Sequence, residues 1–197
     1  SMKKFAVFVI VAVALWPPML AAQYHVDTLI INRWGFPITD YGLFGEAASW
    51  RVPSHSYFFG CGPWVGAIAG SDTLVSVGYD PNGGYSELSA GDSLTTPGDT
   101  LTRVYRSGRR WPPPQWRFPR APQAQRSDQD LWTLFNDFDS SRHVAPGRPL
   151  EVQFYLTAYA WADPLAQDFV FLRYEIENQS HDTLRQMYAG IALDPDI

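Results

Sequence analysis

The sequence has very little lysine and cysteine. Its 197 residues contain two lysines, Lys3 and Lys4, and one cysteine, Cys61. A single cysteine cannot form an intramolecular disulfide. Beyond position 4 there is no lysine for a Schiff base or an isopeptide bond. The neighbours of Cys61 are mostly apolar residues or glycine, which indicates a buried, unreactive thiol.

The sequence also lacks the local motifs of common hydrolases and metalloenzymes. Its four histidines are scattered, none lies in an H-E-x-x-H motif, and no G-x-S-x-G motif occurs. A Ser/His/Asp set can still assemble in the fold, as can two carboxylates at the ~5–10 Å separation of glycoside hydrolases. The sequence therefore favours a protein without an active site but leaves this alternative open.

Positive charge is scarce as well. After residue 22 the chain carries 15 − 2 = 13 arginines against 20 acidic residues, a net charge of −7. Nucleic acids require a basic surface, so we expect no nucleic-acid partner. Several arginines do cluster in a proline-rich stretch, from Arg103 to Arg126. We interpret this cluster first as a solvated loop and second as an anion site.

The N-terminal segment is apolar and predicts export. Ser1 precedes the initiator methionine and is interpreted as a cloning scar, while an uninterrupted apolar run covers residues 5–15. We expect a signal peptide over residues 1–22, cleaved before Gln23, and therefore a secreted or cell-surface protein without further membrane contact. The alternative is an uncleaved membrane anchor, because the segment is just long enough to span a bilayer.

The remaining residues, 23–197, are enough for one domain with a hydrophobic core. Apolar and polar residues alternate over 150–157 and 170–177, a pattern typical of strands. Residues 168–193 resemble two antiparallel strands joined by a tight loop. The second of these strands should direct alternate side chains inward, namely Met187, Ala189, Ile191 and Leu193.

One segment follows a helical period instead. Ser127 can cap a helix, Asp130 stands where a capping box has its acid, and four apolar residues follow at helical spacing. The sequence thus predicts a mainly β chain: an antiparallel β-sandwich with one short helix at about 127–138, preceded by a signal-peptide helix. The proline-rich loop 107–125 is expected to cover an edge strand.

Acidic residues suggest calcium but have simpler interpretations. Oxygen ligands at alternating positions suit calcium, although the EF-hand pattern is absent. The same acids would stabilise the first turn of the expected helix or form turns. No cofactor is certain, and calcium is retained as a hypothesis at Asp128, Asp130, Asp137, Asp139, Asp194 and Asp196.

Aspartates also begin several predicted strands. Asp-Thr-Leu recurs at four places, including Asp99, and Asp92 begins the variant Asp-Ser-Leu. Aspartate side chains accept hydrogen bonds from backbone amides shortly after them and thereby fix turns. We therefore expect a local structural role for these aspartates.

Three aromatic residues in the proline-rich loop are candidate ligand contacts. Trp111, Trp116 and Phe118 can stack on sugar rings or contact a surface protein. The alternative is that they close the end of the sandwich or cover its edge.

Several motifs resemble a known group of proteins. They include Tyr41-Gly42-Leu43-Phe44-Gly45, Tyr57-Phe58-Phe59-Gly60, Trp64-Val65-Gly66-Ala67, Asp128-Gln129-Asp130-Leu131-Trp132, Asn136-Asp137-Phe138-Asp139, His143, Phe171-Leu172-Arg173-Tyr174 and Asp194-Pro195-Asp196. Together they resemble the N-terminal region of large exported bacterial surface proteins that often carry fibronectin-like repeats and a type IX secretion sorting domain. The resemblance covers residues 32–197. It implies a surface location and a domain truncated at its C-terminus, with the rest of a larger chain as its partner, and it implies no established activity.

The sequence therefore predicts a structural or adhesion-type module of an exported protein without catalytic activity. Two alternatives remain. The first is a carbohydrate-binding or carbohydrate-active domain, suggested by the loop tryptophans and the acidic residues. The second is a surface module that calcium stabilises.

Overall fold

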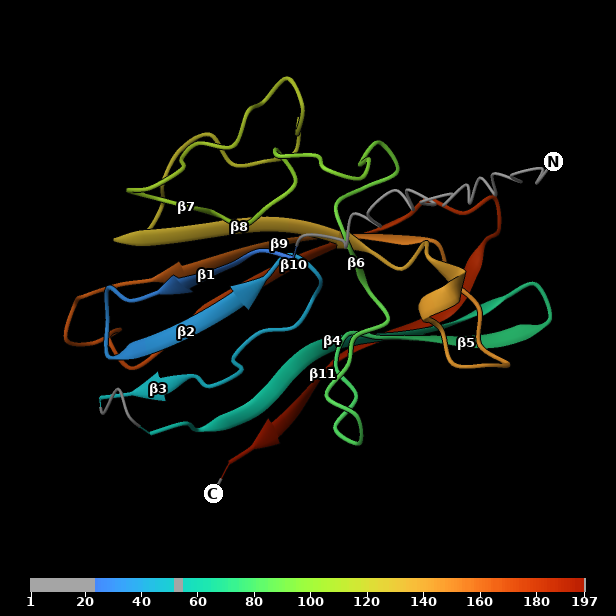
Figure 1. The fold of residues 1–197 in the computed structure, drawn as a ribbon, viewed down its shortest axis with the longest axis horizontal. Coiled ribbons are helices and arrows are strands. Elements are labelled where there is room, and N and C mark those ends of the chain that lie inside the picture. Colours follow the sequence, from blue (N-terminus) through green and yellow to red (C-terminus); the bar gives the residue numbers. More distant parts are fainter. Residues whose placement is uncertain (1–23, 52–54, 197) are drawn as a thin grey trace, which may run out of the picture.

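The computed structural model describes residues 24–51 and 55–196, and this part of the chain is mainly β (Figure 1). It contains eleven strands, and its one helical element is a single 3-10 turn, Ser140–Arg142. The predicted signal peptide, 1–22, lies outside the described residues. No helix in the described ranges is long and apolar enough to cross a membrane.

The largest sheet has five antiparallel strands in the order β10-β9-β8-β6, with β7 also paired to β8. Its strands are β6 (Ser89–Ala90), β7 (Tyr105–Arg106), β8 (Gln129–Asn136), β9 (Val152–Ala160) and β10 (Phe171–Asn178). The alternation seen over 150–157 and 170–177 correctly predicted β9 and β10. These two strands pair along their whole common length, from Phe171 opposite Tyr159 to Asn178 opposite Val152.

Two three-stranded sheets lie opposite the large one, in the orders β11-β4-β5 and β1-β2-β3. Phe44 bridges them, because it pairs with Ile38 on one side and with Cys61 on the other. Their strands are β1 (Val26–Leu29), β2 (Trp34–Thr39), β3 (Ser49–Trp50), β4 (Phe58–Ala69), β5 (Asp72–Val77) and β11 (Leu184–Pro195).

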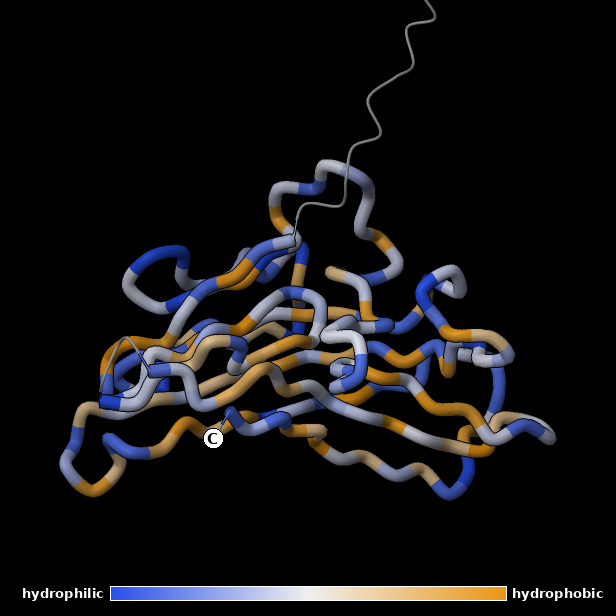
Figure 2. The backbone as a smooth tube through the Cα atoms, turned by 60° about the horizontal axis from the view of Figure 1, so that its bottom comes forward, coloured by the Kyte–Doolittle hydropathy of each residue, from blue (hydrophilic) through white to orange (hydrophobic). Residues whose placement is uncertain are grey.

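The main hydrophobic core fills the space between the large sheet and the smaller ones. Leu131 and Phe135 of β8 and Phe154 of β9 belong to the same buried cluster as Ile38 and Val65 from the opposite side. Hydrophobic residues concentrate along the strands, whereas hydrophilic residues gather in the connecting segments (Figure 2). The fold therefore derives its stability mainly from apolar burial between sheets.

Cys61 is part of this core, as the sequence predicted. It is 1% exposed, and burial raises the pKa of its thiol to about 11. A thiol with such a pKa is almost entirely protonated at neutral pH, so Cys61 is a poor nucleophile.

The helix predicted at about 127–138 is wrong, because this segment forms β8. All eight residues of β8 are buried. Because β8 is covered on both faces, its apolar residues Leu131, Trp132, Leu134 and Phe135 face both sides and lose the alternation that distinguishes a strand from a helix. The expected Ser127–Asp130 contact does exist, with the Ser127 amide donating to Asp130 Oδ1 at 2.8 Å. It stabilises the turn before the strand instead of a helix.

A second hydrophobic cluster explains why β8 is buried on both faces. Trp132 and Leu134 point away from the main core and contact Tyr105, Phe118 and Ala121. The last three residues belong to segment 91–126, which we call the loop layer; it lies above the five-stranded sheet in Figure 1. The prediction that the proline-rich loop covers an edge strand is therefore wrong: it covers a sheet face.

The predicted pairing within residues 168–193 is also wrong. β10 pairs with β9 and β11 pairs with β4, so the chain passes from one sheet to another after Asn178. Alternation shows that a segment is a strand but not which strand it pairs with. The register places Ala189, Ile191 and Leu193 on the face of Val65 and Cys61, as expected, yet Ile191 and Leu193 are 49% and 53% exposed. Met187, the fourth residue expected there, lies in a register shift without a partner on β4 and is 42% exposed.

Candidate functional site

Two cavities lie against the same part of the loop layer, residues 92–103. The first, which we call the Tyr24 cavity, has a volume of about 510 Å³. The second, which we call the Trp111 cavity, is a shallow depression that opens widely to solvent and has a volume of about 500 Å³. Both have the size of ordinary small-molecule sites. The shared segment has to be rigid for either cavity to be a formed site.

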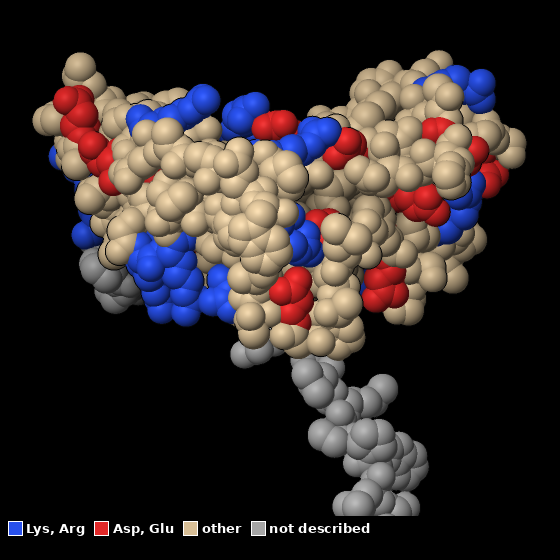
Figure 3. Space-filling model, turned by 90° about the horizontal axis from the view of Figure 1, so that it is seen from above, with Lys and Arg blue, Asp and Glu red and all other residues tan. Residues whose placement is uncertain are grey.

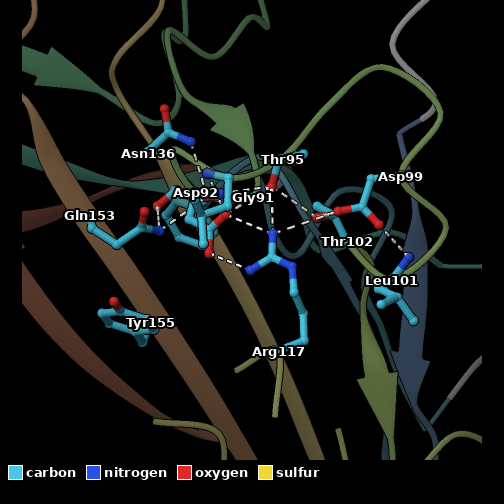
Figure 4. A network of polar contacts seen from close by, with 12 residues as sticks. Gly91, Asp92, Thr95, Asp99, Leu101, Thr102, Arg117, Asn136, Gln153 and Tyr155 are labelled. Carbon is cyan, nitrogen blue, oxygen red and sulfur yellow. Dashed lines mark hydrogen bonds and ion pairs between the residues drawn. The ribbon is translucent and has the colours of Figure 1, made fainter. Parts of the chain in front are cut away.

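An ion pair holds this segment against the proline-rich loop (Figure 4). Arg117 Nη1 donates to Asp92 Oδ2 at 2.7 Å, and Arg117 Nη2 donates to Asp92 Oδ1 at 2.8 Å. The carboxylate of Asp99 lies 3.6 Å from the same guanidinium group. Two parallel hydrogen bonds of this kind fix both the distance and the relative orientation of the two side chains.

Backbone amides complete the coordination of the two aspartates. Asp92 Oδ1 accepts from the amide of Leu94 at 3.1 Å, and Asp99 Oδ1 accepts from the amide of Leu101 at 2.8 Å. This confirms the turn-forming role that the sequence predicted. Burial tends to raise the pKa of both carboxyl groups, but hydrogen bonds and the charge of Arg117 outweigh it and hold each pKa below its ordinary value.

The start of the segment is attached to the large sheet. The carbonyl oxygen of Gly91 accepts from Asn136 Nδ2 at 2.9 Å and from Gln153 Nε2 at 3.0 Å. Gly91 has φ +89°, and an added Cβ would lie 2.0 Å from Thr95 Oγ1. Both observations require glycine at this position. Segment 92–103 is therefore held by the sheet at one end and by Arg117 along its length.

The Tyr24 cavity is lined mainly by polar side chains that already bond to the protein. Arg142 Nη1 donates to the Tyr24 hydroxyl at 2.5 Å, and Arg142 Nη2 donates to the Ser86 carbonyl at 2.8 Å. Asp92 and Asp99 contribute to the opposite wall and are bound to Arg117. A ligand here would have to compete with these internal hydrogen bonds.

The Trp111 cavity differs because two of its cationic side chains have no acidic partner. It is lined by Thr100, Leu101, Arg103, Tyr105, Arg110, Trp111, Pro112 and Pro114. Neither Arg103 nor Arg110 forms an ion pair with a carboxylate among the described residues. Arg110 is exposed and Trp111 is half-buried. The cavity therefore presents an indole ring beside uncompensated positive charge.

The structure separates the three aromatic residues that the sequence singled out. Trp111 lines the cavity, and Trp116, on the same loop, is 78% exposed. Phe118 is 3% exposed, and its ring centroid lies 5.3 Å from that of Trp132. Phe118 is thus a core residue and offers no face to a ligand, which corrects its assignment as a ligand contact. For Phe118 the alternative, a covering role, is the correct interpretation.

The six candidate calcium ligands do not converge. Asp130 and Asp137 occupy opposite ends of β8, and seven residues of strand separate them by about 23 Å. Asp130 accepts from the amides of Arg126 and Ser127, and Asp137 from those of Leu150 and Val152. At the two ends of the strand, these carboxylates thus accept hydrogen bonds from backbone amides of the adjoining segments.

The other four aspartates also have local partners or lie apart. Asp128 accepts from the Ala162 amide, Asp139 accepts from the Ser141 amide, and Asp194 Oδ2 accepts from the Tyr79 hydroxyl at 2.8 Å. Asp196 follows the end of β11. Within the ranges that the structure describes, no three His, Cys, Asp or Glu side chains form a group able to hold a metal ion.

Sequence reasoning missed a buried cluster of titratable side chains. His143 Nε2 lies 3.0 Å from the Asp137 carbonyl oxygen, and its Nδ1 lies 3.4 Å from Glu87 Oε2. Glu87 accepts from the amides of Val77 and Val144. The side chain of His143 is completely buried. The cluster joins β5 to the end of β8 and has no opening for a substrate, so its role is structural.

The chain matches no known family model, no curated protein and no solved structure. The resemblance to exported bacterial surface proteins therefore stays a prediction. The assignment of a function depends on the geometry of the two cavities and of the surfaces around them.

Proposed function

We propose that this chain is a non-catalytic, adhesion-type β-sandwich module of an exported protein, and that the Trp111 cavity binds an acidic carbohydrate. The observation that carries the proposal is the placement of Arg103 and Arg110, both without an acidic partner, beside the indole of Trp111. The proposal combines two alternatives that the sequence left open: a carbohydrate-binding domain, and an anion site at the arginine cluster.

The architecture supports a sandwich module. One hydrophobic core lies between the five-stranded sheet and the smaller sheets, and strands of both layers contribute to it. The loop layer is attached to the outer face of the larger sheet by a second core. Binding residues on loops that a rigid β scaffold positions are common in adhesion-type modules.

The chemistry of the cavity suits a sugar acid. An aromatic ring stacks on the apolar face of a pyranose, and a guanidinium group binds a carboxylate through two parallel hydrogen bonds. The surface above the five-stranded sheet carries both arginine and acidic groups (Figure 3). Because positive and negative groups are interspersed on this face, it offers no broad basic surface of the kind that nucleic acids require, and a small anionic ligand fits better.

The titratable groups support a non-catalytic role. Among the described residues, the close Glu87–His143 pair is buried, His25 is paired with the buried Asp40 at 2.9 Å, and Asp92 and Asp99 are bonded to Arg117. A catalytic acid or base has to reach the proton that it transfers. These side chains instead bond to other groups of the protein and hold its segments together.

A glycan array with neutral and uronate-containing oligosaccharides tests the proposal. We expect binding of the uronates alone, weakened by salt because the contact is ionic. Arg110→Gln should lower the affinity about tenfold, the loss expected for one charge-assisted hydrogen bond. Arg110 is exposed, so the variant should fold normally.

Arg126→Gln is the matched control, because Arg126 is also an exposed arginine of the loop layer without an ion pair but does not line the cavity. It should bind like the unmodified protein. Equal losses in both variants would show that the effect is one of net charge, and an array without any binding would refute the carbohydrate ligand.

A further inference from the structure

β11 is an edge strand twelve residues long. It pairs with β4 on one side, and no described strand pairs with its other side. Half of its backbone amides and carbonyls therefore point away from the sheet. A free strand edge of this length is a template for pairing with another strand.

The side chains of β11 are exposed on both faces of the sheet. Tyr188 on the outer face is 76% exposed, and Ile191 and Leu193 on the inner face are about half exposed. Their neighbours on β4, Cys61 and Val65, are buried on that same inner face. Apolar side chains that point toward a core and remain exposed indicate that something else covers them.

The middle of the strand lacks the charges and prolines that usually protect an edge, although register shifts interrupt its pairing with β4 at Arg185–Tyr188 and at Asp194–Pro195. Residues 187–193 contain no charged side chain and no proline. An added Cβ at Gly190 would meet no atom within 4 Å, so the outer face of the sheet is uncovered at this residue. The opposite edge of the same sheet, β5, has only six residues, and its Asp72 forms an ion pair with Arg148. The two edges of this sheet are therefore not equivalent.

We propose that a second copy of this chain pairs with the free edge, β11 against β11 in antiparallel orientation across a twofold axis. The result is a continuous six-stranded sheet with β5 at both outer edges. Such an interface is closed, because each copy uses the same strand and no further edge of that strand remains.

The charges of β11 are complementary to themselves in this orientation. Arg185 stands near the start of the strand; at the other end Asp194 is bonded to the Tyr79 hydroxyl, and Asp196 directly follows the strand. Antiparallel pairing brings the positive end of each copy to the negative end of the other. Parallel pairing would bring like charges together, which is unfavourable. The charge pattern therefore favours a twofold arrangement over a parallel one.

The regular part of the edge is long enough for a weak contact. It lies between the two register shifts, from Tyr188 to Asp194, and seven residues at about 3.4 Å each give about 24 Å, with one sheet layer about 10 Å thick. With the exposed inner-face side chains, two copies would bury roughly 700 Å² in total, which is below the range of stable specific interfaces. We therefore expect a dimer that dissociates on dilution.

Light scattering and sedimentation of the chain over a wide concentration range test the proposal. We expect a monomer–dimer equilibrium that Ile191→Lys abolishes, because the lysine would lie on the inner face among the apolar side chains of the partner strand. The matched control is Val75→Lys, which places a lysine at a similarly exposed residue of β5, on the opposite edge. This variant should dimerise normally, and circular dichroism should show that both variants fold.

A charge exchange tests the orientation. Arg185→Glu should weaken the dimer, and adding Asp196→Arg to it should restore dimerisation, since the opposite charges would again meet across the axis. A chain that stays monomeric at every concentration would overturn the proposal and assign the edge to a strand of another polypeptide. A dimer that survives Ile191→Lys would also overturn it, because the interface would then lie elsewhere.

Discussion

The outer face of β8 and the free edge of β11 carry similar residues but have different surroundings. Trp132 and Leu134 on β8 are buried under the loop layer, whereas Tyr188 and Ile191 on β11 are exposed. The difference depends on segment 91–126, most of which is irregular and which covers one sheet and not the other. The comparison shows that burial of a strand depends on its cover as much as on its own sequence.

The cover of the large sheet is held by side chains as well as by backbone ladders. In the loop layer, the Arg117–Asp92 ion pair and the hydrogen bonds from Asn136 and Gln153 to Gly91 take the place of the backbone hydrogen bonds that would join strands. Irregular segments need such bonds, because buried backbone groups without partners are costly. The loop layer should therefore be sensitive to the loss of a few specific contacts.

The largest expected effect concerns the aromatic residues of the two strands. Trp132→Ala removes a buried indole from between β8 and the loop layer, and should lower the free energy of unfolding by about 3–5 kcal/mol. Tyr188→Ala removes an exposed ring on β11 and should change it by less than about 0.5 kcal/mol in the monomer. Urea unfolding at low protein concentration measures both. Equal losses would show that β11 is covered in solution.

An intermediate effect is expected for the ion pair of the loop layer. Arg117→Met should lower the free energy of unfolding at neutral pH by about 2 kcal/mol, because Asp92 loses two charge-assisted hydrogen bonds in a half-buried site. The control is Arg126→Met, which removes an exposed arginine of the same layer. Chemical denaturation of the two variants provides the comparison.

The same variants predict a difference in acid. The pKa values of Asp92 and Asp99 lie below the ordinary value of 3.8 in the folded protein. Their stabilising contribution is therefore complete above pH 3.8 and is lost as the pH falls through the lowered values. The Arg117→Met variant should lose less stability in this range than the unmodified protein. An identical decrease in both proteins would contradict the assigned role of Arg117.

The smallest expected effect is that of calcium. The aspartates at the ends of β8 are occupied by backbone amides, so adding calcium or a chelator should leave the melting temperature unchanged. Asp196 follows the end of β11 and is half-buried. A calcium-dependent rise in melting temperature that Asp196→Asn abolishes would place an ion at the β11 end and restore the calcium hypothesis.

Much of the fold could be predicted from the sequence, because apolar and polar residues alternate along several of its strands. This pattern correctly predicted β9 and β10. It failed at β8, where cover on both faces removes the alternation. It also could not assign the partner of β11, since the pairing with β4 depends on distant residues.

The candidate site was only partly predictable. Trp111 was selected by residue type, and Arg103 and Arg110 belong to the arginine cluster that has an anion site as its second interpretation. The sequence could not show that these two arginines lack an acidic partner. Nor could it show that Arg117 forms an ion pair with Asp92, which lies 25 residues earlier. Such pairings between loops follow no local period, so only the folded chain reveals them. The same is true of Phe118, whose burial depends on Trp132.

The pairing of β11 with β4 also has a consequence for the order of folding. Leu184 opposes Ala69, which is 184 − 69 = 115 residues earlier in the chain. Contacts of such separation form slowly, because a long loop must close before they can form. The β4–β5 hairpin is therefore synthesised long before its third strand and exposes the edge of β4 in the interval. Successful folding thus requires that no other strand occupies this edge before β11 arrives.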